Sequence, residues 1–378
     1  MAKRRKLPKE PEKEEGIASA LVRKGAAPCK YYISTGSLLL DLAISDRYPG
    51  GGIGSGRITH IYGDNSTAKS VIAQEVIGDA QRKGGSGVYE DAEATLDFPR
   101  ARALFGMTAG DWEDQQVRDD CMELATDKVV GICPNFIYRV PASIEGIFDD
   151  EIMPVCKLIG SGKLPGPCAM AIDTFSALPS EAELKAKLVE GTYGTSRAKQ
   201  MSAAFRKYIR GIEAGDLTIL AVDQTREAIG RQFGPKHCVS GGRAMQFYAS
   251  TRILLKTAGR VKNAHGRVIG VDIKAIIEKN KIAPPHREAS FRILFDYGID
   301  NIASNLLWLK ENATEEKIEC KLTMAGSWWK WEGEGMGQGE QAACKFIEDK
   351  SLEQQLDEEL VRVWRIVHTP PDRKARER

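Results

Sequence analysis

The chain has 378 residues and a formal net charge of +2, with 42% hydrophobic and 28% charged residues, which is typical of a soluble globular protein. No apolar run approaches the roughly 18 residues of a membrane-spanning helix, and no basic-then-apolar signal segment opens the chain, so no membrane partner is expected. The eight cysteines are scattered without a C-x-x-C pair, which argues against a disulfide framework or a zinc site and favours the cytoplasm.

A polar, charged arm at residues 1–30 comes first, and we expect one short helix in it, near residues 15–23, and a role in self-association. From residue 31 onward, strand-like and helix-like stretches alternate. Strands are predicted in chain order at 57–62, 87–91, 168–173 and 217–223, and helices at 71–81 and 196–213. This alternation indicates an α/β fold with a mainly parallel central sheet that is flanked by helices.

Three further strands, predicted at 252–256, 272–278 and 290–295, follow one another without long helices and are expected to extend one side of the sheet. From residue 298 the pattern changes to a helix, a Trp- and Gly-rich hairpin and another helix. The expected domains are a core at 31–297, a small α+β C-terminal domain at 298–367 and a basic disordered tail at 368–378.

A phosphate-binding loop is predicted between the first strand and its helix, where the sequence matches the pattern G-x-x-x-x-G-K-[ST] except at Ala68. In this pattern backbone N–H groups wrap the phosphates of ATP, the lysine binds the β- and γ-phosphates, and the hydroxyl binds Mg²⁺. The predicted ATP-binding residues of the loop are Gly63, Asp64, Asn65, Ser66, Thr67, Ala68, Lys69 and Ser70. Alanine at position 68 is tolerated if its backbone is right-handed, and weakens the site by about 1 kcal/mol if φ is positive.

Two acidic residues follow predicted strands. Asp173 ends the strand at 168–173, where a carboxylate can hold Mg²⁺ together with Ser70. Glu93 follows the strand at 87–91 and can orient or deprotonate the attacking water. Either acid alone is more often a solvated carboxylate at a strand end, but the phosphate loop that precedes both favours the catalytic interpretation.

Several blocks of the chain resemble the RecA recombinase family, including its phage members. They are residues 33–42 (ISTGSLLLDL), 89–97 (YEDAEATLD), 171–178 (AIDTFSAL), 241–250 (GGRAMQFYAS), 279–284 (KNKIAP) and 326–339, beside the phosphate loop. The resemblance covers about residues 31–340. It implies a RecA-like P-loop ATPase core, and a DNA-dependent ATPase that self-associates into a helical filament on single-stranded DNA. Such a filament promotes homologous pairing with duplex DNA and strand exchange.

The resemblance also implies roles in ATP hydrolysis. Glu93 is then the carboxylate that activates water, with Lys69 as the catalytic cation on the phosphates. Gln224, at the end of the strand predicted at 217–223, senses the γ-phosphate and couples it to the DNA-binding segment that follows. Asp97 meets the adenine amino group, and Arg100 stands where the family usually has an aromatic ring over the base. A guanidinium plane can also stack on a base.

Three residues are implied to act across a subunit interface in the filament. Lys279 and Lys281 match lysines that reach the ATP of the neighbouring subunit, as an arginine finger does. Phe247 matches a residue that passes the ATP signal across the interface.

Two segments are expected to bind DNA, one at 225–242, which is glycine-rich and basic, and one in the helix that follows residues 190–194. The predicted DNA-binding residues are Lys199, Ser202, Arg206, Arg226, Ile229, Arg231, Gly241, Gly242 and Arg243. Lys199, Ser202 and Arg206 share one helix face on a 3.6-residue period. The alternative interpretations are an ordinary mobile surface loop for the first segment and a solvated basic stripe for the helix face.

The chain also departs from the family pattern. Residues 107–167 exceed the usual spacing, so the polar, acidic stretch at 111–127 is expected to be a surface insertion, and the short arm and basic tail favour a phage-type or divergent member. Two other functions stay open. One is a RecA-fold motor that forms closed rings, as a hexameric helicase does. The other is a catalytically weak DNA-binding or regulatory paralogue, which Ala68 and Arg100 suggest.

Overall fold

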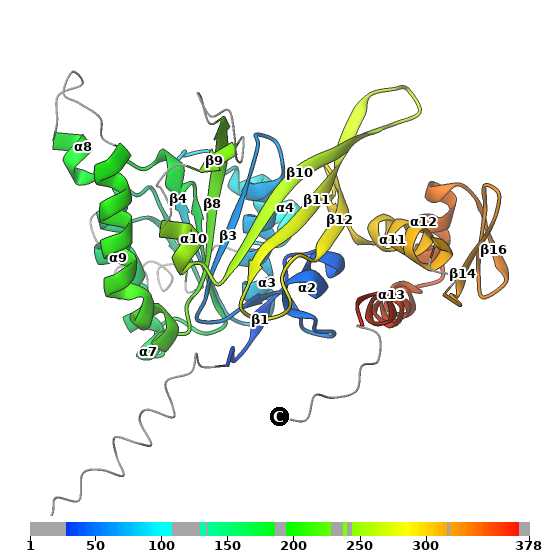
Figure 1. Cartoon of the computed structure of the whole chain (residues 1–378), viewed down its shortest axis with the longest axis horizontal. Helices are drawn as coiled ribbons and strands as arrows, with labels where there is room; N and C mark the ends of the chain where they lie inside the picture. The colour runs from blue at the N-terminus through cyan, green and yellow to red at the C-terminus, as the bar shows by residue number, and fades with distance from the viewer. Residues whose placement is uncertain are drawn as a thin grey trace, which may run out of the picture.

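The protein folds around one wide sheet with helices on both faces, and a smaller antiparallel sheet lies at the C-terminal end of the chain (Figure 1). The computed structural model describes residues 28–107, 129–133, 135–185, 194–227, 237–239, 244–315 and 318–369. This arrangement confirms the predicted α/β class with a mainly parallel sheet and a small C-terminal α+β part. Among the described residues, no helix combines the length and the apolar character that crossing a bilayer requires.

The strands run as follows along the chain. They are β1 (Tyr32–Ile33), β2 (Ile53–Gly54), β3 (Ile58–Gly63), β4 (Ser86–Asp91), β5 (Val129–Cys133), β6 (Phe136–Arg139), β7 (Cys168–Asp173), β8 (Thr218–Glu227), β9 (His237–Val239), β10 (Thr251–Lys262), β11 (Val268–Asn280), β12 (Glu288–Leu294), β13 (Gly298–Asp300), β14 (Leu322–Ala325), β15 (Trp328–Trp331) and β16 (Glu334–Gln338).

The helices connect and cover these strands. They are α2 (Leu38–Ser45), α3 (Lys69–Arg82), α4 (Phe98–Phe105), α6 (Ile144–Gly146), the π-helix η1 (Ile147–Ile152), α7 (Met153–Gly160), the 3₁₀ turn η2 (Phe175–Ala177), α8 (Glu181–Lys185), α9 (Gly194–Ala214), α10 (Ala244–Tyr248), α11 (Asn301–Glu315), α12 (Glu340–Asp349) and α13 (Glu353–His368).

The main sheet has the strand order β13-β12-β11-β10-β3-β8-β7-β4-β6-β5, with β9 paired to β8. Neighbours from β10 to β6 are parallel, whereas β11, β12 and β13 add antiparallel strands beyond β10. Strands β10, β11 and β12 are the three that were predicted to extend one side of the sheet, and β13 was not predicted. Because parallel strands need crossover connections, the helices between them cover both faces.

Two hydrophobic clusters form the core, one on each face of the sheet. Helices α2, α3 and α4 contribute to the first cluster, together with the buried side chains of α11 and α13. Helices α6, α7, α9 and α10 contribute to the second. The strands of the parallel region are buried on both faces, and the apolar runs of β7 and β8 are typical of such strands.

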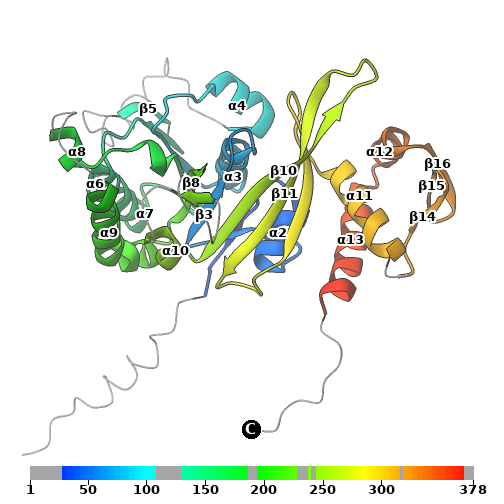
Figure 2. The same ribbon diagram turned by 45° about the horizontal axis from the view of Figure 1, so that its top comes forward.

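The hairpin of β10 and β11 is longer than predicted and projects away from the body of the sheet (Figure 2). Its inner half alternates between buried and partly exposed residues, and this half was recognised in the sequence. The outer half is exposed on both faces, so it lacks the apolar alternation that identifies a strand. Its pairing to the neighbouring strand, rather than burial, keeps it extended.

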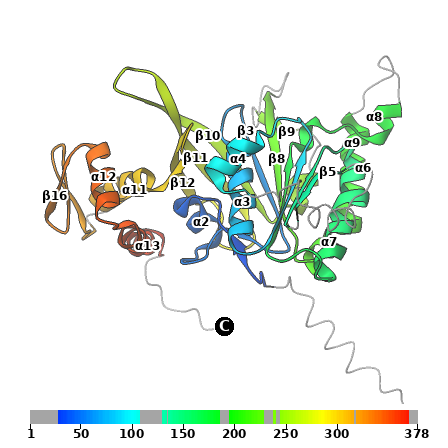
Figure 3. The same cartoon turned by 180° about the vertical axis from the view of Figure 1, so that it is seen from behind.

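The C-terminal part consists of α11, the antiparallel sheet β14-β15-β16, α12 and α13 (Figure 3). Trp329, Trp331 and Trp364 are buried in its core. The Trp364 indole donates to Asp46, the C-cap of α2, over 3.3 Å, which connects this part to the helix that packs on the main sheet.

Candidate functional site

Most of the residues that were predicted to bind and hydrolyse ATP lie together at one edge of the sheet, where β3, β4, β7 and β8 end. A cavity of about 290 Å³ opens there. Its lining residues are Asn65, Ser66, Thr67, Ala68, Lys69, Ser70, Val71, Glu93, Asp173, Thr174 and Gln224. Carboxyl ends of parallel strands share one edge, so residues far apart in the sequence gather in this cavity.

The loop after β3 leads directly into α3, which begins at Lys69, two residues earlier than predicted. The first backbone N–H groups of a helix lack partners within it and carry its positive dipole end, which suits an anion. Ala68, at the N-cap, supplies no side-chain hydrogen bond that would occupy them.

The ammonium of Lys69 lies inside this loop. It donates to the carbonyl oxygens of Asp64 over 2.7 Å and Gly63 over 3.2 Å. Burial lowers the pKa of Lys69, and the nearby carboxylates, led by Asp173 and Asp64, oppose that shift. The positive charge of Lys69 thus lies at the N-terminus of α3. There phosphate oxygens can replace the carbonyl groups as acceptors of its hydrogen bonds.

Ala68 has the left-handed conformation, with φ 63° and ψ 22°. The condition for an unstrained alanine, a right-handed backbone, is therefore not met. An L-residue in this conformation brings Cβ close to its carbonyl oxygen, which glycine avoids.

We expect Ala68→Gly to raise the free energy of unfolding by about 1 kcal/mol, because it removes this strain. Ala73→Gly in the interior of the same helix is the matched control, and it should lower the free energy by about 1 kcal/mol or more. Denaturant unfolding of both variants measures whether each change raises or lowers the free energy of unfolding. Destabilisation by both changes would contradict the strained geometry of position 68.

The metal-binding prediction concerns Ser70 and Asp173. Asp173 ends β7 and is buried, which raises its pKa, while hydrogen bonds from the hydroxyls of Ser70 and Tyr89 oppose the rise. The Tyr89 hydroxyl lies 2.9 Å from Asp173 Oδ2. A carboxylate beside a serine hydroxyl at a phosphate loop provides the oxygen ligands that Mg²⁺ prefers, so the residues present fit this ion.

Glu93 contacts both Thr174 and Gln224 in the lining of this cavity. Thr174 Oγ1 and Gln224 Nε2 donate to Glu93 Oε1 over 3.2 and 3.3 Å. Thr225 Oγ1 donates to Asp64 Oδ1, so the strand end that carries Gln224 also contacts the phosphate loop. Sequence reasoning missed Thr174, although its place directly after Asp173 is a usable signal.

A second, more apolar cavity of about 170 Å³ adjoins the phosphate loop and shares Ser66, Ala68 and Val71 with the first. Its other lining residues are Arg100, Leu104, Phe105, Val271, Ile293, Leu294, Phe295 and Gly298. Arg100 Nη2 donates to the Phe295 carbonyl over 2.8 Å. Asp97 instead caps the start of α4, where it accepts from Arg100 N over 3.1 Å, and lies outside the lining of this cavity. Phe295 had no local signal in the sequence.

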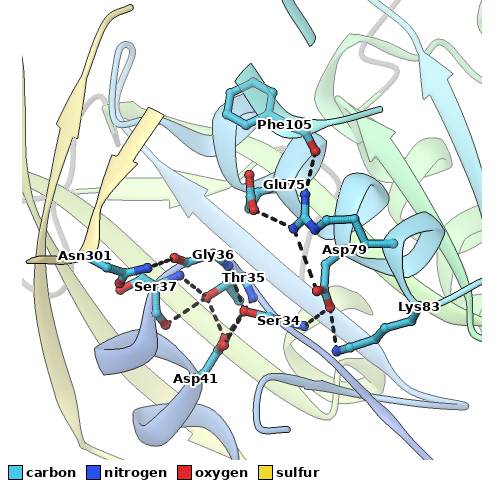
Figure 4. A network of polar contacts seen from close by, with 11 residues as sticks. Ser34, Thr35, Gly36, Ser37, Asp41, Glu75, Asp79, Lys83, Phe105 and Asn301 are labelled. Carbon is cyan, nitrogen blue, oxygen red and sulfur yellow. Dashed lines mark hydrogen bonds and ion pairs between the residues drawn. The ribbon is translucent and has the colours of Figure 1, made fainter. Parts of the chain in front are cut away.

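A polar network connects α3 to the residues that follow β1 and to the end of α4 (Figure 4). Asp79 accepts from Ser34 N over 2.7 Å and from Lys83 Nζ over 2.6 Å. Arg82 links Glu75 to the Phe105 carbonyl, with distances of 2.8 and 2.6 Å. The helix that presents the phosphate loop is therefore fixed to the strand β1 region and to the end of α4.

One buried acid close to the site has an unusual environment. Glu90 on β4 is fully buried, and among the described residues neither of its carboxylate oxygens has a hydrogen-bond partner. Burial raises its pKa to about 7, although Arg139 on the neighbouring strand opposes the rise. Arg139 itself pairs with Glu151.

Because the pKa of Glu90 is raised on folding, its contribution to stability is present at low pH and lost as the pH rises through about 7. We expect Glu90→Gln to stabilise the protein relative to wild type by about 2 kcal/mol more at pH 8 than at pH 5. Unfolding at both values tests this, with the exposed Glu348→Gln as control. An equal effect at both pH values would rule out a raised pKa.

The residues predicted to act across an interface lie away from the phosphate loop of their own chain. Phe247 on α10 is 66% exposed. Lys279 Nζ donates to the carbonyl oxygens of Gln246 and Phe247 over 2.7 and 2.9 Å. Lys281 lines a groove with Arg47, Arg57 and other residues near β1.

The predicted DNA-binding face of α9 is exposed. Lys199 and Arg206 are exposed and Ser202 is half-buried, whereas Met201 and Phe205 pack into the core. The structure does not describe Ile229, Arg231, Gly241, Gly242 or Arg243, nor residues 1–27 of the predicted arm and the predicted insertion at 111–127. The backbone of Arg226 belongs to β8, which pairs with β9 there.

Two comparisons with known proteins agree with this geometry. The family profile of the RecA N-terminal domain matches residues 10–111 and 154–300, and skips a stretch that overlaps the expected insertion. Protein RecA of Chlamydia muridarum is 31% identical over 328 residues, which are 86% of this chain and 80% of that protein. Protein RecA of Bifidobacterium breve is 32% identical over 340 residues, 89% of this chain and 75% of that protein. Protein RecA of Acinetobacter baylyi is 30% identical over 317 residues, 84% of this chain and 78% of that protein.

Proposed function

Because this chain belongs to the RecA family, we propose that it is a DNA-dependent ATPase that forms a filament on single-stranded DNA and promotes homologous pairing and strand exchange. The observation that carries the proposal is the convergence of Lys69, Asp173, Glu93 and Gln224 on one cavity at the ends of four strands. A family relative without catalysis has no need for an acid, a metal carboxylate and a phosphate cation at one place.

Each group has a separate task in this proposal. Lys69 and the amino end of α3 hold the phosphates, and Ser70 with Asp173 hold Mg²⁺, which neutralises developing negative charge on the phosphate oxygens. Glu93 orients a water molecule and accepts its proton. Gln224, in hydrogen-bond contact with Glu93, responds when a γ-phosphate occupies the cavity.

The second cavity suits the base of the nucleotide. Its apolar lining adjoins the phosphate loop, and the Arg100 guanidinium at its edge can stack on a planar ring. The neighbouring subunit is contacted by Lys279, Lys281 and Phe247. Their position away from the phosphate loop of their own chain supports this role.

Strand β8 offers the route from ATP to DNA. It carries Gln224 at the cavity and continues to Glu227, at the start of the segment predicted to bind DNA. Displacement of Gln224 by a γ-phosphate therefore acts on the first residues of that segment. The exposed cations of α9 add contacts to the phosphates of the DNA, and such contacts weaken with salt.

The test is ATP turnover with and without single-stranded DNA. We expect a strong rise with DNA, which falls as salt is added. Turnover that ignores DNA would count against the proposal. Electron microscopy separates open helical filaments from the closed rings of a hexameric motor, and nucleotide binding without turnover in any condition would favour the regulatory paralogue.

A further inference from the structure

A buried polar network lies beside the nucleotide cavity, on the face of the sheet opposite α3. His60 on β3 is 1% exposed and Asp223 on β8 is 0% exposed. His60 Nε2 and Asp223 Oδ2 are 2.9 Å apart. Burying a carboxylate is costly unless it is hydrogen-bonded. The contact with His60 therefore matters for Asp223, because among the described residues its other oxygen, Oδ1, has no hydrogen-bond partner.

The network continues through Arg252 on β10. Arg252 Nε donates to His60 Nδ1 over 3.4 Å. A guanidinium only donates, so Nδ1 is the acceptor and the ring proton lies on Nε2, from which it is donated to Asp223. The imidazole ring thus links the Arg252 guanidinium to the Asp223 carboxylate.

A β-bulge brings in the fourth member. Between Arg252 and Ile253 the partner on β11 changes from Lys279 to Ile277, so Glu278 is the extra residue. Its carboxylate accepts from Arg252 Nη1 over 3.2 Å and from the Tyr62 hydroxyl. The Arg252 guanidinium also lies 4.6 Å from the centre of the Tyr62 ring.

Both ends of this network border functional groups. Asp223 directly precedes Gln224, whose side chain contacts Glu93. At the other end, Glu278 directly precedes Lys279, whose ammonium holds the last turn of α10 at Gln246 and Phe247. Side-chain hydrogen bonds, joined by the consecutive residues Asp223–Gln224 and Glu278–Lys279, thus link the nucleotide cavity to the helix that carries the exposed Phe247.

The geometry points to a positioning relay, in which His60, Asp223, Arg252 and Glu278 transmit movement of Gln224 to α10. Gln224 and Asp223 are consecutive on one strand, so their side chains leave opposite faces of it and move together when the strand end rotates. A close-packed, hydrogen-bonded interior adopts discrete arrangements and does not deform continuously. A shift of Asp223 therefore changes the positions of Arg252 and Glu278. The inference rests on the proposed function and adds the residues that connect its two sites.

The test is hydrogen exchange in α10, measured on protein dilute enough to sediment as a monomer, with Mg²⁺ and an ATP analogue that resists hydrolysis. In the wild type the analogue should change the protection of residues 244–248. His60→Leu removes both hydrogen bonds of the ring and should abolish that change while the analogue still binds. His60→Gln, which can donate to Asp223 and accept from Arg252, should keep it.

Two further variants separate a relay from general stabilisation. Arg252→Met breaks the network at a partly exposed position and should behave like His60→Leu, even if the latter folds poorly. Ile219→Ala weakens the same strand at its far, buried end and should leave the response of α10 intact.

A response of α10 that survives both His60→Leu and Arg252→Met overturns the relay, as does a wild type without any response. Loss of the response in Ile219→Ala as well would assign the network to stability alone. DNA-stimulated ATP turnover of the wild type is measured in a separate assay. Failure of the proposed function can therefore be distinguished from failure of the relay.

Discussion

Lys69→Ala is expected to reduce ATP turnover roughly 100- to 1000-fold, because loss of a positioned cation removes stabilisation of the charge that develops on the transferred phosphoryl group. In the structure the ammonium bonds to loop carbonyl oxygens and lies among the carboxylates of Asp173 and Asp64. The lost contacts are local to the loop, so the variant should stay folded. Turnover with saturating single-stranded DNA measures the effect.

Lys83→Ala is the matched control, since it removes a lysine from the other end of the same helix. Lys83 pairs with Asp79 at a partly exposed position, where an ion pair contributes little to stability. Its turnover should stay within about twofold of wild type, a difference of under 1 kcal/mol in barrier height. Full activity of Lys69→Ala would show that the loop does not grip the phosphates.

Glu93→Gln is expected to lower turnover about 100- to 10 000-fold, because an amide cannot accept the proton of the attacking water. The amide still accepts hydrogen bonds from Thr174 and Gln224 through its oxygen, so the wall of the cavity is preserved. Nucleotide affinity should therefore change little. Single-turnover hydrolysis and equilibrium binding of ATP separate the two effects.

Glu348→Gln, an exposed acid on α12, is the control for the loss of one negative charge. It should leave both hydrolysis and binding unchanged. Equal losses of affinity and turnover in Glu93→Gln would indicate that this carboxylate shapes the cavity instead of acting on water.

Much of the fold was predictable because its signals are local. The parallel strands β3, β4, β7 and β8 each contain a short stretch of residues that favour strands, bounded by polar residues or glycine, and each was recognised to within a few residues. The phosphate loop was recognised because backbone wrapping demands small residues at fixed spacing. Once the sheet was parallel, the meeting of Glu93, Asp173 and Gln224 near Lys69 followed from the direction of the strands.

The conformation of Ala68 could not be predicted from its type, since alanine normally avoids positive φ. The outer half of the β10–β11 hairpin was also missed, because strand pairing maintains it without an apolar face. Likewise, Phe295 enters the second cavity from the turn that follows β12, far from the phosphate loop in the sequence.

By itself, then, the sequence determined the α/β class and the family and predicted the reactive groups, since each depends on short stretches whose chemistry and spacing are visible in order. Only the tertiary structure decided the strained loop, the lining of the second cavity and the buried pairing of His60 with Asp223. Those features arise where strands distant in the sequence lie side by side, and the energy of a buried polar group depends on neighbours that no local pattern specifies.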